Sequence, residues 1–342
     1  MQPDLWSLYG LMLKSRLFEE AIASLWQAGR ISGEMHLGTG EEGILAGVVD
    51  HLREGDAMAL DHRGSAALLM RGVDPMLILR ELLGRSDGLC GGTGGHMHLF
   101  SREHLAASSG IVGAAGPAAA GFALAGQMLR PHSVAVAFFG EGSMNQGMLM
   151  ESLNLASVWN LPVLFVCKDD GWAITTKPRQ STAGDLDERA QGLGVPVVVA
   201  DGRDVVSVWD AAGQAVERAR SGLGPTFLHA RCVHLEGHFL GLQLIRLLRD
   251  PLREIPPIPG PLIKSMLQPG GAPFRERLEG LGMVLGAVIA TLRDPRRDPA
   301  NDPLRRTRLF LRSEAERLQE FEDQIRREME ELLASALVEG IS

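Results

Sequence analysis

Cysteine is scarce in this chain. Its 342 residues include only Cys90, Cys167 and Cys232, an odd number without the spacing of a metal site. These three residues argue against a disulfide framework and favour a reducing compartment. The chain also lacks an apolar run of the ~20 residues that a membrane span needs, and the basic start and apolar core of a signal peptide. We therefore expect a cytoplasmic protein with no part in a membrane.

Positive charge is also in short supply. Lys and Arg number 34 against 42 Asp and Glu, which gives a formal net charge of -8. A nucleic acid is therefore not expected as a partner. What the chain has in quantity is hydrophobic residues, 45%, and glycine, 41 residues. This composition is typical of a globular enzyme with many tight turns, and the length suffices for one large α/β domain or two modest ones.

Two apolar runs that each end in carboxylates and a glycine are the most informative feature. The first run, 134–139, ends in the sequence GEG, which contains Glu141, and the second, 161–167, ends in KDDG, which contains Asp170. Helical spacing of apolar residues separates the two runs. Buried parallel strands of this kind bring their carboxyl ends to one edge of a sheet. Oxygen ligands gathered there suit a hard cation and a diphosphate that the cation holds.

Strand-like and helix-like segments alternate over the first 240 residues, which predicts an α/β fold with a parallel sheet covered by helices on both faces. A long loop is expected at 84–109, and loops of that length are usually functional. The expected strands are 56–60, 134–139, 161–167, 195–200 and 226–232, and the expected helices are 4–29, 41–53, 75–83, 110–127 and 204–220.

The character of the chain changes after residue 240. Residues 251–274 hold seven of the 18 prolines, and a charged helix is expected from 313 to about 338. We divide the chain into an α/β domain, 1–240, a proline-rich segment, 241–312, and a C-terminal helix, 313–342. The apolar stripe of that helix is expected to fold back on the domain, with contact to a partner as the alternative. The stripe consists of Leu318, Phe321, Ile325, Met329 and Leu332.

The segment 138–176 resembles the thiamine-diphosphate signature, in which GDG is followed further along the chain by NN. More closely, its sequence NQGMLMESLNLASVWNLPV is similar to the α subunit of the E1 component of 2-oxo acid dehydrogenase and acetoin dehydrogenase complexes. The resemblance covers roughly 4–239 and returns weakly at 311–335. It implies the thiamine-diphosphate-binding fold.

The resemblance also implies a metal site at Glu141, Asp170 and the backbone carbonyl of Trp172. Both side chains depart from the family pattern, because Glu141 is one methylene longer than the usual Asp and Asp170 is charged where an amide is usual. The resemblance implies Mg²⁺. Because magnesium demands near-octahedral geometry whereas calcium tolerates variation, the two departures leave Ca²⁺ or Mn²⁺ as alternatives. A surface turn is the structural alternative for the second run's end.

Contacts to thiamine diphosphate are implied at further positions. Arg63 matches the arginine that meets the diphosphate, and His62 stands where the family has tyrosine. Gly142 and Ser143 are expected at a helix amino terminus, where free N–H groups favour an anion. The alternative for Arg63 is a solvated loop.

Gly110 and Val112 lie in the sequence GIVG. In the resembled family the backbone of this motif contacts the aminopyrimidine ring, and glycine there permits a close approach. The alternative is a simple turn at a helix entry.

Three histidines match histidine positions of the resembled family, and two of them, His36 and His238, match positions near its reacting groups. His238 and His36 are expected to have catalytic roles, because a pKa near ~6.5 suits proton transfer. His98 is expected to order its loop. A structural or solvated histidine is the alternative in each case.

The resemblance implies oxidative decarboxylation of a 2-oxo acid or cleavage of acetoin, with the acyl group passed to the lipoyl group of an E2 acyltransferase. It further implies an α2β2 heterotetramer in which a separate β subunit completes the site. Two alternatives stay open. One is a non-catalytic subunit, suggested by Glu141 and Asp170, and the other is a transketolase-like thiamine enzyme.

Overall fold

The computed structural model describes residues 2–174, 176–240 and 298–338, together with positions 273, 275 and 282. The proline-rich stretch expected at 251–274 lies outside the described residues apart from position 273. The division of the chain into three parts therefore stays a prediction.

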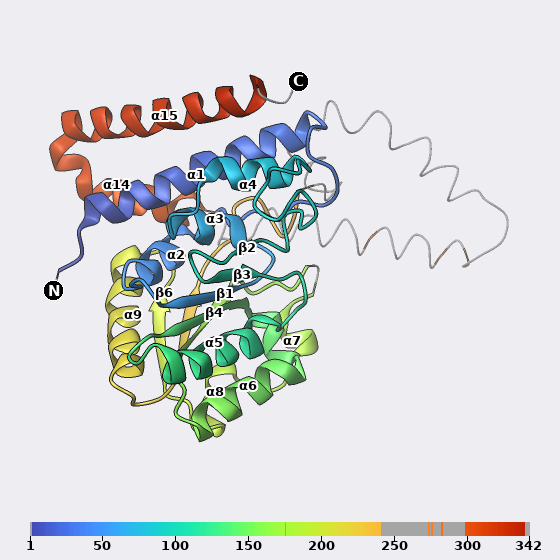
Figure 1. Cartoon of the computed structure of the whole chain (residues 1–342), viewed down its shortest axis with the longest axis vertical. Helices are drawn as coiled ribbons and strands as arrows, with labels where there is room; N and C mark the ends of the chain where they lie inside the picture. Colours follow the sequence, from blue (N-terminus) through green and yellow to red (C-terminus); the bar gives the residue numbers. More distant parts are fainter. Residues whose placement is uncertain are drawn as a thin grey trace.

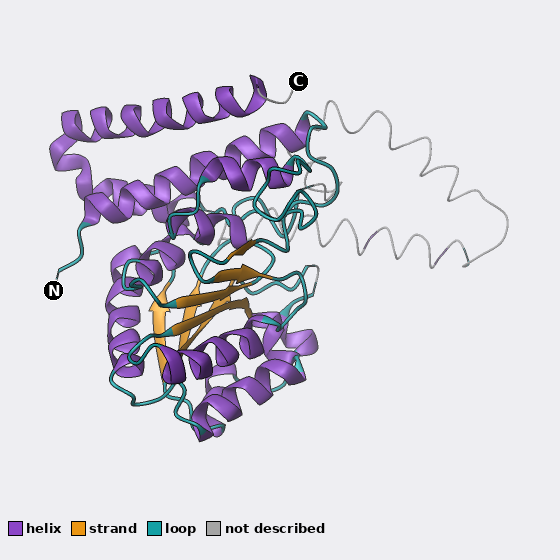
Figure 2. Cartoon of the chain, in the orientation of Figure 1, coloured by secondary structure: helices purple, strands orange, loops and turns teal. Residues whose placement is uncertain are grey.

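A seven-stranded sheet forms the centre of the molecule, in the order β2-β3-β1-β4-β5-β7-β6 (Figures 1 and 2). Every pair in it is parallel except β2 with β3. The predicted parallel sheet is confirmed, with an antiparallel pair added at one edge. The strands are β1 (Ala57–Leu60), β2 (Phe100–Ser101), β3 (Ala106–Ser108), β4 (Ala135–Gly140), β5 (Val163–Asp169), β6 (Val197–Asp201) and β7 (Thr226–Arg231).

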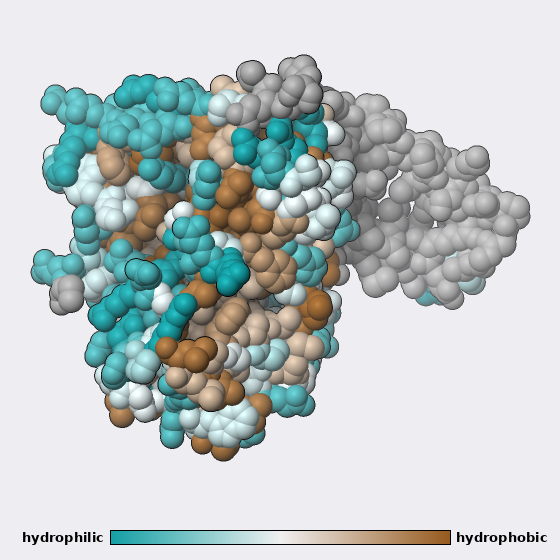
Figure 3. Space-filling model, in the orientation of Figure 1, coloured by the Kyte–Doolittle hydropathy of each residue, from teal (hydrophilic) through white to brown (hydrophobic). Residues whose placement is uncertain are grey.

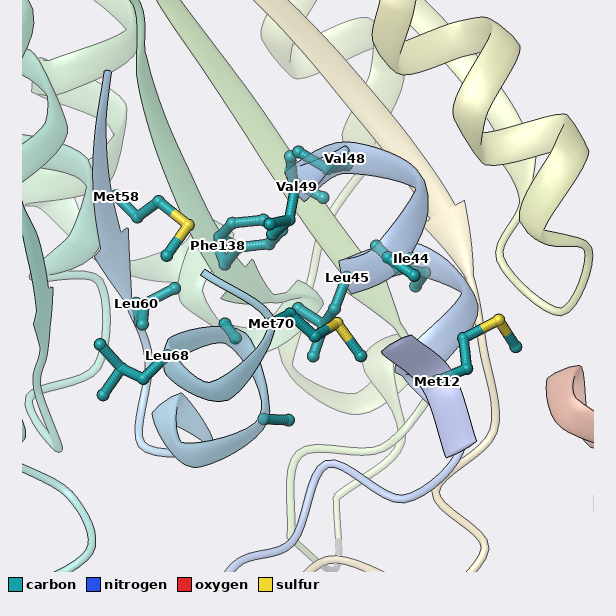
Figure 4. Packing of buried hydrophobic residues seen from close by; sticks show 14 of the residues in the cluster. Met12, Ile44, Leu45, Val48, Val49, Met58, Leu60, Leu68, Met70 and Phe138 are labelled. Atoms are coloured by element: carbon teal, nitrogen blue, oxygen red, sulfur yellow. The ribbon is translucent and has the colours of Figure 1, made fainter. Parts of the chain in front are cut away.

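Helices cover both faces of this sheet, as predicted. Successive residues of β4 point to opposite sides, so that Phe138 enters one buried cluster and Phe139 the other. Figure 4 shows Phe138 in the first of these clusters, among residues of the helices and strands around it. The first cluster includes α1 (Leu5–Gln27), α2 (Glu42–Val49), α3 (Gly64–Met70), α4 (Pro75–Leu82), α9 (Val205–Arg220), α14 (Pro303–Leu311) and α15 (Ala315–Val338), and the second includes α5 (Ala115–Leu129), α6 (Gly147–Val158) and α8 (Leu186–Gly192).

The C-terminal helix α15 packs on α1 (Figure 1). All five residues of its predicted apolar stripe belong to the first buried cluster or pack against it. Across the same contact, Tyr9 Oη donates a hydrogen bond of 2.6 Å to Glu322 Oε1, and Arg308 Nε donates to the same carboxylate. The expectation that this stripe folds back on the domain is confirmed.

Some elements differ from those expected. The helix expected from residue 110 begins only at Ala115, because Gly113 takes a left-handed φ of 86° that a helix cannot contain. Strands β2 and β3 lie within the stretch expected to be loop. Among the described helices, none is both long and apolar enough to cross a membrane.

Candidate functional site

The carboxyl ends of β1, β4 and β5, the turn at 110–113 and the segment after β7 surround a cavity of about 300 Å³. Of the eleven residues predicted for the site, ten line this cavity, and His36 touches two of the ten. The lining includes His62, Arg63, Gly110, Val112, Glu141, Gly142, Ser143, Asp170, Trp172 and His238.

Two buried carboxyl groups at neighbouring strand ends line the cavity. Glu141 directly follows β4 and Asp170 directly follows β5, and they are 3% and 8% exposed. Burial, together with the negative charge of Asp170, raises the pKa of Glu141. Its Oε1 atom is buried without a hydrogen-bond partner. The backbone N–H of Trp172 donates to Asp170 Oδ1 at 3.2 Å, which ties the third predicted ligand residue to the pair.

His234 lies between Asp170 and a second buried carboxylate. Its Nδ1 atom is 2.8 Å from Asp170 Oδ2 and its Nε2 atom is 2.6 Å from Glu41 Oε1. Burial and the charge of Arg63 lower the pKa of His234, but the two carboxylates outweigh them and raise it to about 9. In the same way burial opposes charge on Asp170, but His234 lowers the pKa of that carboxyl group. His234 is therefore an imidazolium near neutral pH.

Lys168 is a second buried cation beside Glu41. It is 2% exposed, and its Nζ atom lies 2.5 Å from Glu41 Oε2 and 3.0 Å from Asp61 Oδ2. Burial disfavours the charge of Lys168, but both carboxylates raise its pKa above the ordinary value. Sequence analysis missed the roles of Glu41, Lys168 and His234. The one available signal was a lysine at the end of a buried strand, where an ionised group needs a partner.

Arg63 joins two segments at the edge of the cavity. It is 2% exposed, and its guanidinium donates hydrogen bonds to the carbonyl of Leu37 and, at 2.6 Å, to the carbonyl of His238. Arg63 thus holds the loop before α2 against the segment after β7. Its contact with a diphosphate stays a prediction.

Two glycines of the cavity wall leave little room for a side chain. A Cβ atom on Gly110 would lie 2.9 Å from Met97 Sδ, and one on Gly142 would lie 3.1 Å from the Cβ of Ala173. Gly142 and Ser143 belong to a short 3₁₀ turn, Glu141–Asn145, and not to the helix expected there. The extended ψ of 129° at Gln146 separates this turn from α6, so the predicted helix amino terminus was wrong at these two residues.

Four histidine rings form a cluster at the side of the cavity. The ring of His36 lies 4.5 Å from that of His62 and 5.3 Å from those of His238 and His96, measured between centroids. Sequence analysis considered His98, but it is His96 whose Nε2 atom lies 3.0 Å from His36 Nδ1.

All of these rings are held neutral. Burial and the positive charge of neighbouring groups lower the pKa of His36 to about 2 and that of His238 to about 3. Burial also lowers the pKa of His62 to about 4, in spite of the opposing charge of Asp61. Neutral imidazoles keep a lone pair for a proton or a metal ion.

The sequence profile of the dehydrogenase E1 component family matches residues 9–241. This chain belongs to the dehydrogenase E1 component family. The predicted family is therefore confirmed.

Curated relatives of this E1 chain are α subunits. That of acetoin:2,6-dichlorophenolindophenol oxidoreductase from Cupriavidus necator is 41% identical over 237 residues, which cover 69% of this chain and 71% of the relative. The corresponding subunit from Bacillus subtilis is 39% identical, with 69% and 72% covered. The pyruvate dehydrogenase E1 component subunit alpha of Zymomonas mobilis is also 39% identical, with 69% and 67% covered.

The fold of the E1 chain is shared with a solved transketolase structure from Campylobacter jejuni. The TM-score is 0.50 at 18% sequence identity, and the match covers 68% of this chain and 38% of the transketolase chain. At that identity the likeness concerns the fold alone, and it supports the predicted fold class.

The E1 family implies thiamine diphosphate as the cofactor. The residues of the cavity fit it. The unpartnered oxygen of Glu141 beside the charged Asp170 suits a hard divalent cation, which would relieve the repulsion between the two groups. The guanidinium of Arg63 and the imidazolium of His234 supply positive charge for a diphosphate in the same cavity.

Proposed function

We propose that this chain is the α subunit of a thiamine-diphosphate-dependent E1 component that acts on a 2-oxo acid such as pyruvate, or on acetoin. The observation that carries the proposal is the buried Glu141–Asp170 pair at the carboxyl ends of β4 and β5, in which Glu141 Oε1 has no hydrogen-bond partner. Three α subunits of enzymes named for acetoin or pyruvate share 39–41% sequence identity with this chain, which supports the same class of substrate.

The side chains of Glu141 and Asp170 and the backbone carbonyl of Trp172 would hold the metal ion, Mg²⁺ or else Ca²⁺ or Mn²⁺. Arg63 and His62 would meet the diphosphate, as would the backbone of the 3₁₀ turn at Gly142 and Ser143. When bound, thiamine diphosphate supplies the carbanion chemistry that breaks a bond next to a carbonyl group.

The turn at Gly110 and Val112 would lie against the aminopyrimidine ring of the cofactor. His238 and His36 would act on the substrate side. The Nδ1 atom of His238 is buried without a partner, and because this ring is neutral it can accept a proton from a reacting group.

A β subunit is the proposed partner, in an α2β2 assembly that transfers acyl groups to a lipoyl E2 acyltransferase. An exposed apolar face supports a partner chain. Met128 and Leu129 of α5 and Val158 of α6 are 77%, 79% and 66% exposed, and Figure 3 shows apolar side chains gathered over this part of the molecule. The cytoplasmic location stays a prediction.

The test is calorimetric titration of thiamine diphosphate into the chain mixed with its β partner, first with Mg²⁺ and then with Ca²⁺. We expect metal-dependent binding that Glu141→Gln weakens, because the variant loses one ionisable ligand. Glu320→Gln, at an exposed position of α15, is the matched control and should bind as the unaltered chain does.

Two results would change the proposal. Absence of binding with either ion would favour the non-catalytic subunit, in which protein cations such as His234 balance the charge of Asp170. Binding of the cofactor together with turnover of a sugar phosphate, and not of pyruvate or acetoin, would favour the transketolase-like alternative.

A further inference from the structure

The histidine cluster joins three segments that are far apart in the sequence. His36 lies in the loop between α1 and α2, His62 follows β1, and His238 follows β7. Each ring offers a nitrogen atom, and these three atoms lie within 4.8 Å of one another. The rings of His62 and His238 are 5.6 Å apart between centroids. Three potential ligands thus converge on one point at the side of the cavity.

Two nitrogen atoms of this cluster lack hydrogen-bond partners. His62 Nε2 and His238 Nδ1 are buried, and neither has a hydrogen-bond partner. Buried polar atoms are rarely left in this state, because each loses its hydrogen bonds to water without gaining one in the protein. His36 is different, since its Nδ1 atom is already engaged with His96 Nε2 at 3.0 Å. That contact orients the His36 ring and leaves its Nε2 atom for another ligand.

We propose that His36, His62 and His238 form a binding site for a divalent ion of the zinc class, with His96 as the residue that orients His36. Neutral imidazole is a preferred ligand of Zn²⁺, Co²⁺, Ni²⁺ and Cu²⁺. Three histidines leave the fourth position of a tetrahedral ion open. With metal–nitrogen bonds of about 2.0–2.1 Å, the nitrogen atoms would stand roughly 3.4 Å apart. They now lie within 4.8 Å of one another, so binding of an ion would draw the rings closer together.

This site differs in kind from the Glu141–Asp170 pair. Carboxylate and carbonyl oxygens select hard ions such as Mg²⁺, whereas nitrogen ligands select ions of the zinc class. The charges that oppose a dication are those of Arg63, whose guanidinium is held by the carbonyls of Leu37 and His238, and of the buried cations Lys168 and His234. Asp61, next to His62, offsets part of this charge. Affinity in the micromolar range, and not the tightest zinc binding, is therefore expected.

Occupation of the cluster would affect the neighbouring cavity. His62 and His238 both line the cavity. An ion bound to their nitrogen atoms would therefore prevent these atoms from contacting a ligand in the cavity. We therefore expect Zn²⁺ to inhibit the enzyme by competing for these two histidines. This part of the inference rests on the proposed function, whereas metal binding by the cluster does not.

A second group in the described part of the chain, Glu41, Cys232 and His234, also brings three potential ligands together. Its donors are already engaged. Glu41 pairs with Lys168, and both ring nitrogens of His234 face carboxylates. Burial raises the pKa of the Cys232 thiol well above its ordinary value, so the thiol stays protonated. We therefore assign the ion to the histidine cluster.

The test is titration of Co²⁺ into the full chain without thiamine diphosphate, followed by visible absorption. We expect the d–d bands of a four-coordinate nitrogen site at one ion per chain, displaced by Zn²⁺. His62→Tyr should abolish these bands, because it replaces a ligand by a ring without nitrogen, as should His238→Asn. His96→Gln should keep them and weaken binding about tenfold or more. His132→Gln, at an exposed histidine, is the matched control and should change nothing.

Thermal unfolding of each variant without metal verifies that it is folded. Equal Co²⁺ binding in His62→Tyr, His238→Asn and the unaltered chain would overturn the assignment. A thiolate-to-cobalt charge-transfer band would do the same, because it would place the ion at Cys232. Absence of any binding to a folded chain would refute the site and leave the thiamine-diphosphate titration unaffected.

Discussion

Glu19 is a buried carboxyl group outside the lining of the cavity. It lies on α1 with Oε1 accepting a hydrogen bond of 2.9 Å from Ser65 Oγ, and its Oε2 atom is buried without a partner. Burial, together with the negative charges of Glu42 and Glu41, raises the pKa of Glu19 from its ordinary value of 4.5 to about 7. The stability of the folded chain therefore depends on whether Glu19 is protonated.

We predict that Glu19→Gln makes the stability of the chain less dependent on pH. The folded pKa exceeds the unfolded one, so the stabilisation from this group is complete below 4.5 and is lost as the pH rises through about 7. Glutamine does not titrate. The variant should therefore gain up to roughly 3 kcal/mol of unfolding free energy relative to the unaltered chain between about pH 5 and pH 8.5.

Urea unfolding at the two pH values measures this difference. Glu34→Gln, at an exposed position, is the control and should show no such gain. If Glu19→Gln changed the unfolding free energy equally at both pH values, the pKa of Glu19 would not differ between the folded and unfolded states.

At the scale of elements, α15 depends on α1 for its packing. Its stripe is apolar on one side only, and the opposite side is strongly charged. A helix of this kind is stabilised mainly by the face that it buries. Leu318, Ile325 and Met329 are 2%, 3% and 6% exposed, so most of that contribution comes from a few side chains.

We predict that Ile325→Ala lowers the unfolding free energy by about 2–4 kcal/mol, because it leaves a cavity between α15 and α1. The neighbouring Gln324 is exposed, and Gln324→Ala should change stability by less than about 0.5 kcal/mol. Chemical denaturation of both variants gives the comparison. Similar stability of the two would mean that α15 contributes little to the folded domain.

Elements with a strong local pattern were predictable from the sequence. The apolar runs that became β4 and β5 are six and seven residues long and wholly buried apart from their last residues. Strands β2 and β3, of two and three residues, are too short to show a period. They form because β3 pairs with β1 at the edge of the sheet and β2 pairs with β3.

The candidate site was predictable where its residues follow strand ends. Glu141 and Asp170 were found for that reason. The ion pairs of Glu41 were not, because its partners Lys168 and His234 lie 127 and 193 residues away in the chain. No local pattern connects residues at such separations, and only the folded sheet brings them together.

At the scale of the whole molecule, the apolar face of α5 and α6 predicts where another chain binds. We expect Met128→Glu to weaken association with the β subunit about tenfold or more, since burying an unpaired charge in an interface is costly. Leu309→Glu is the control, because Leu309 is 54% exposed on α14, on the other side of the sheet. Light scattering and titration of the mixed subunits measure the effect. Unchanged association in Met128→Glu would place the β subunit elsewhere.

Because Glu41 and Lys168 form a buried ion pair, the effect of a substitution at one of the two positions depends on the residue at the other. Loss of either partner alone unbalances the buried charges, because Lys168 then keeps only Asp61, or Glu41 keeps only His234 and Arg63, whereas replacement of both removes one positive and one negative charge together. Descendants of this sequence should therefore keep or lose the two residues together. The double variant Glu41→Gln/Lys168→Met should accordingly have a higher unfolding free energy than either single variant.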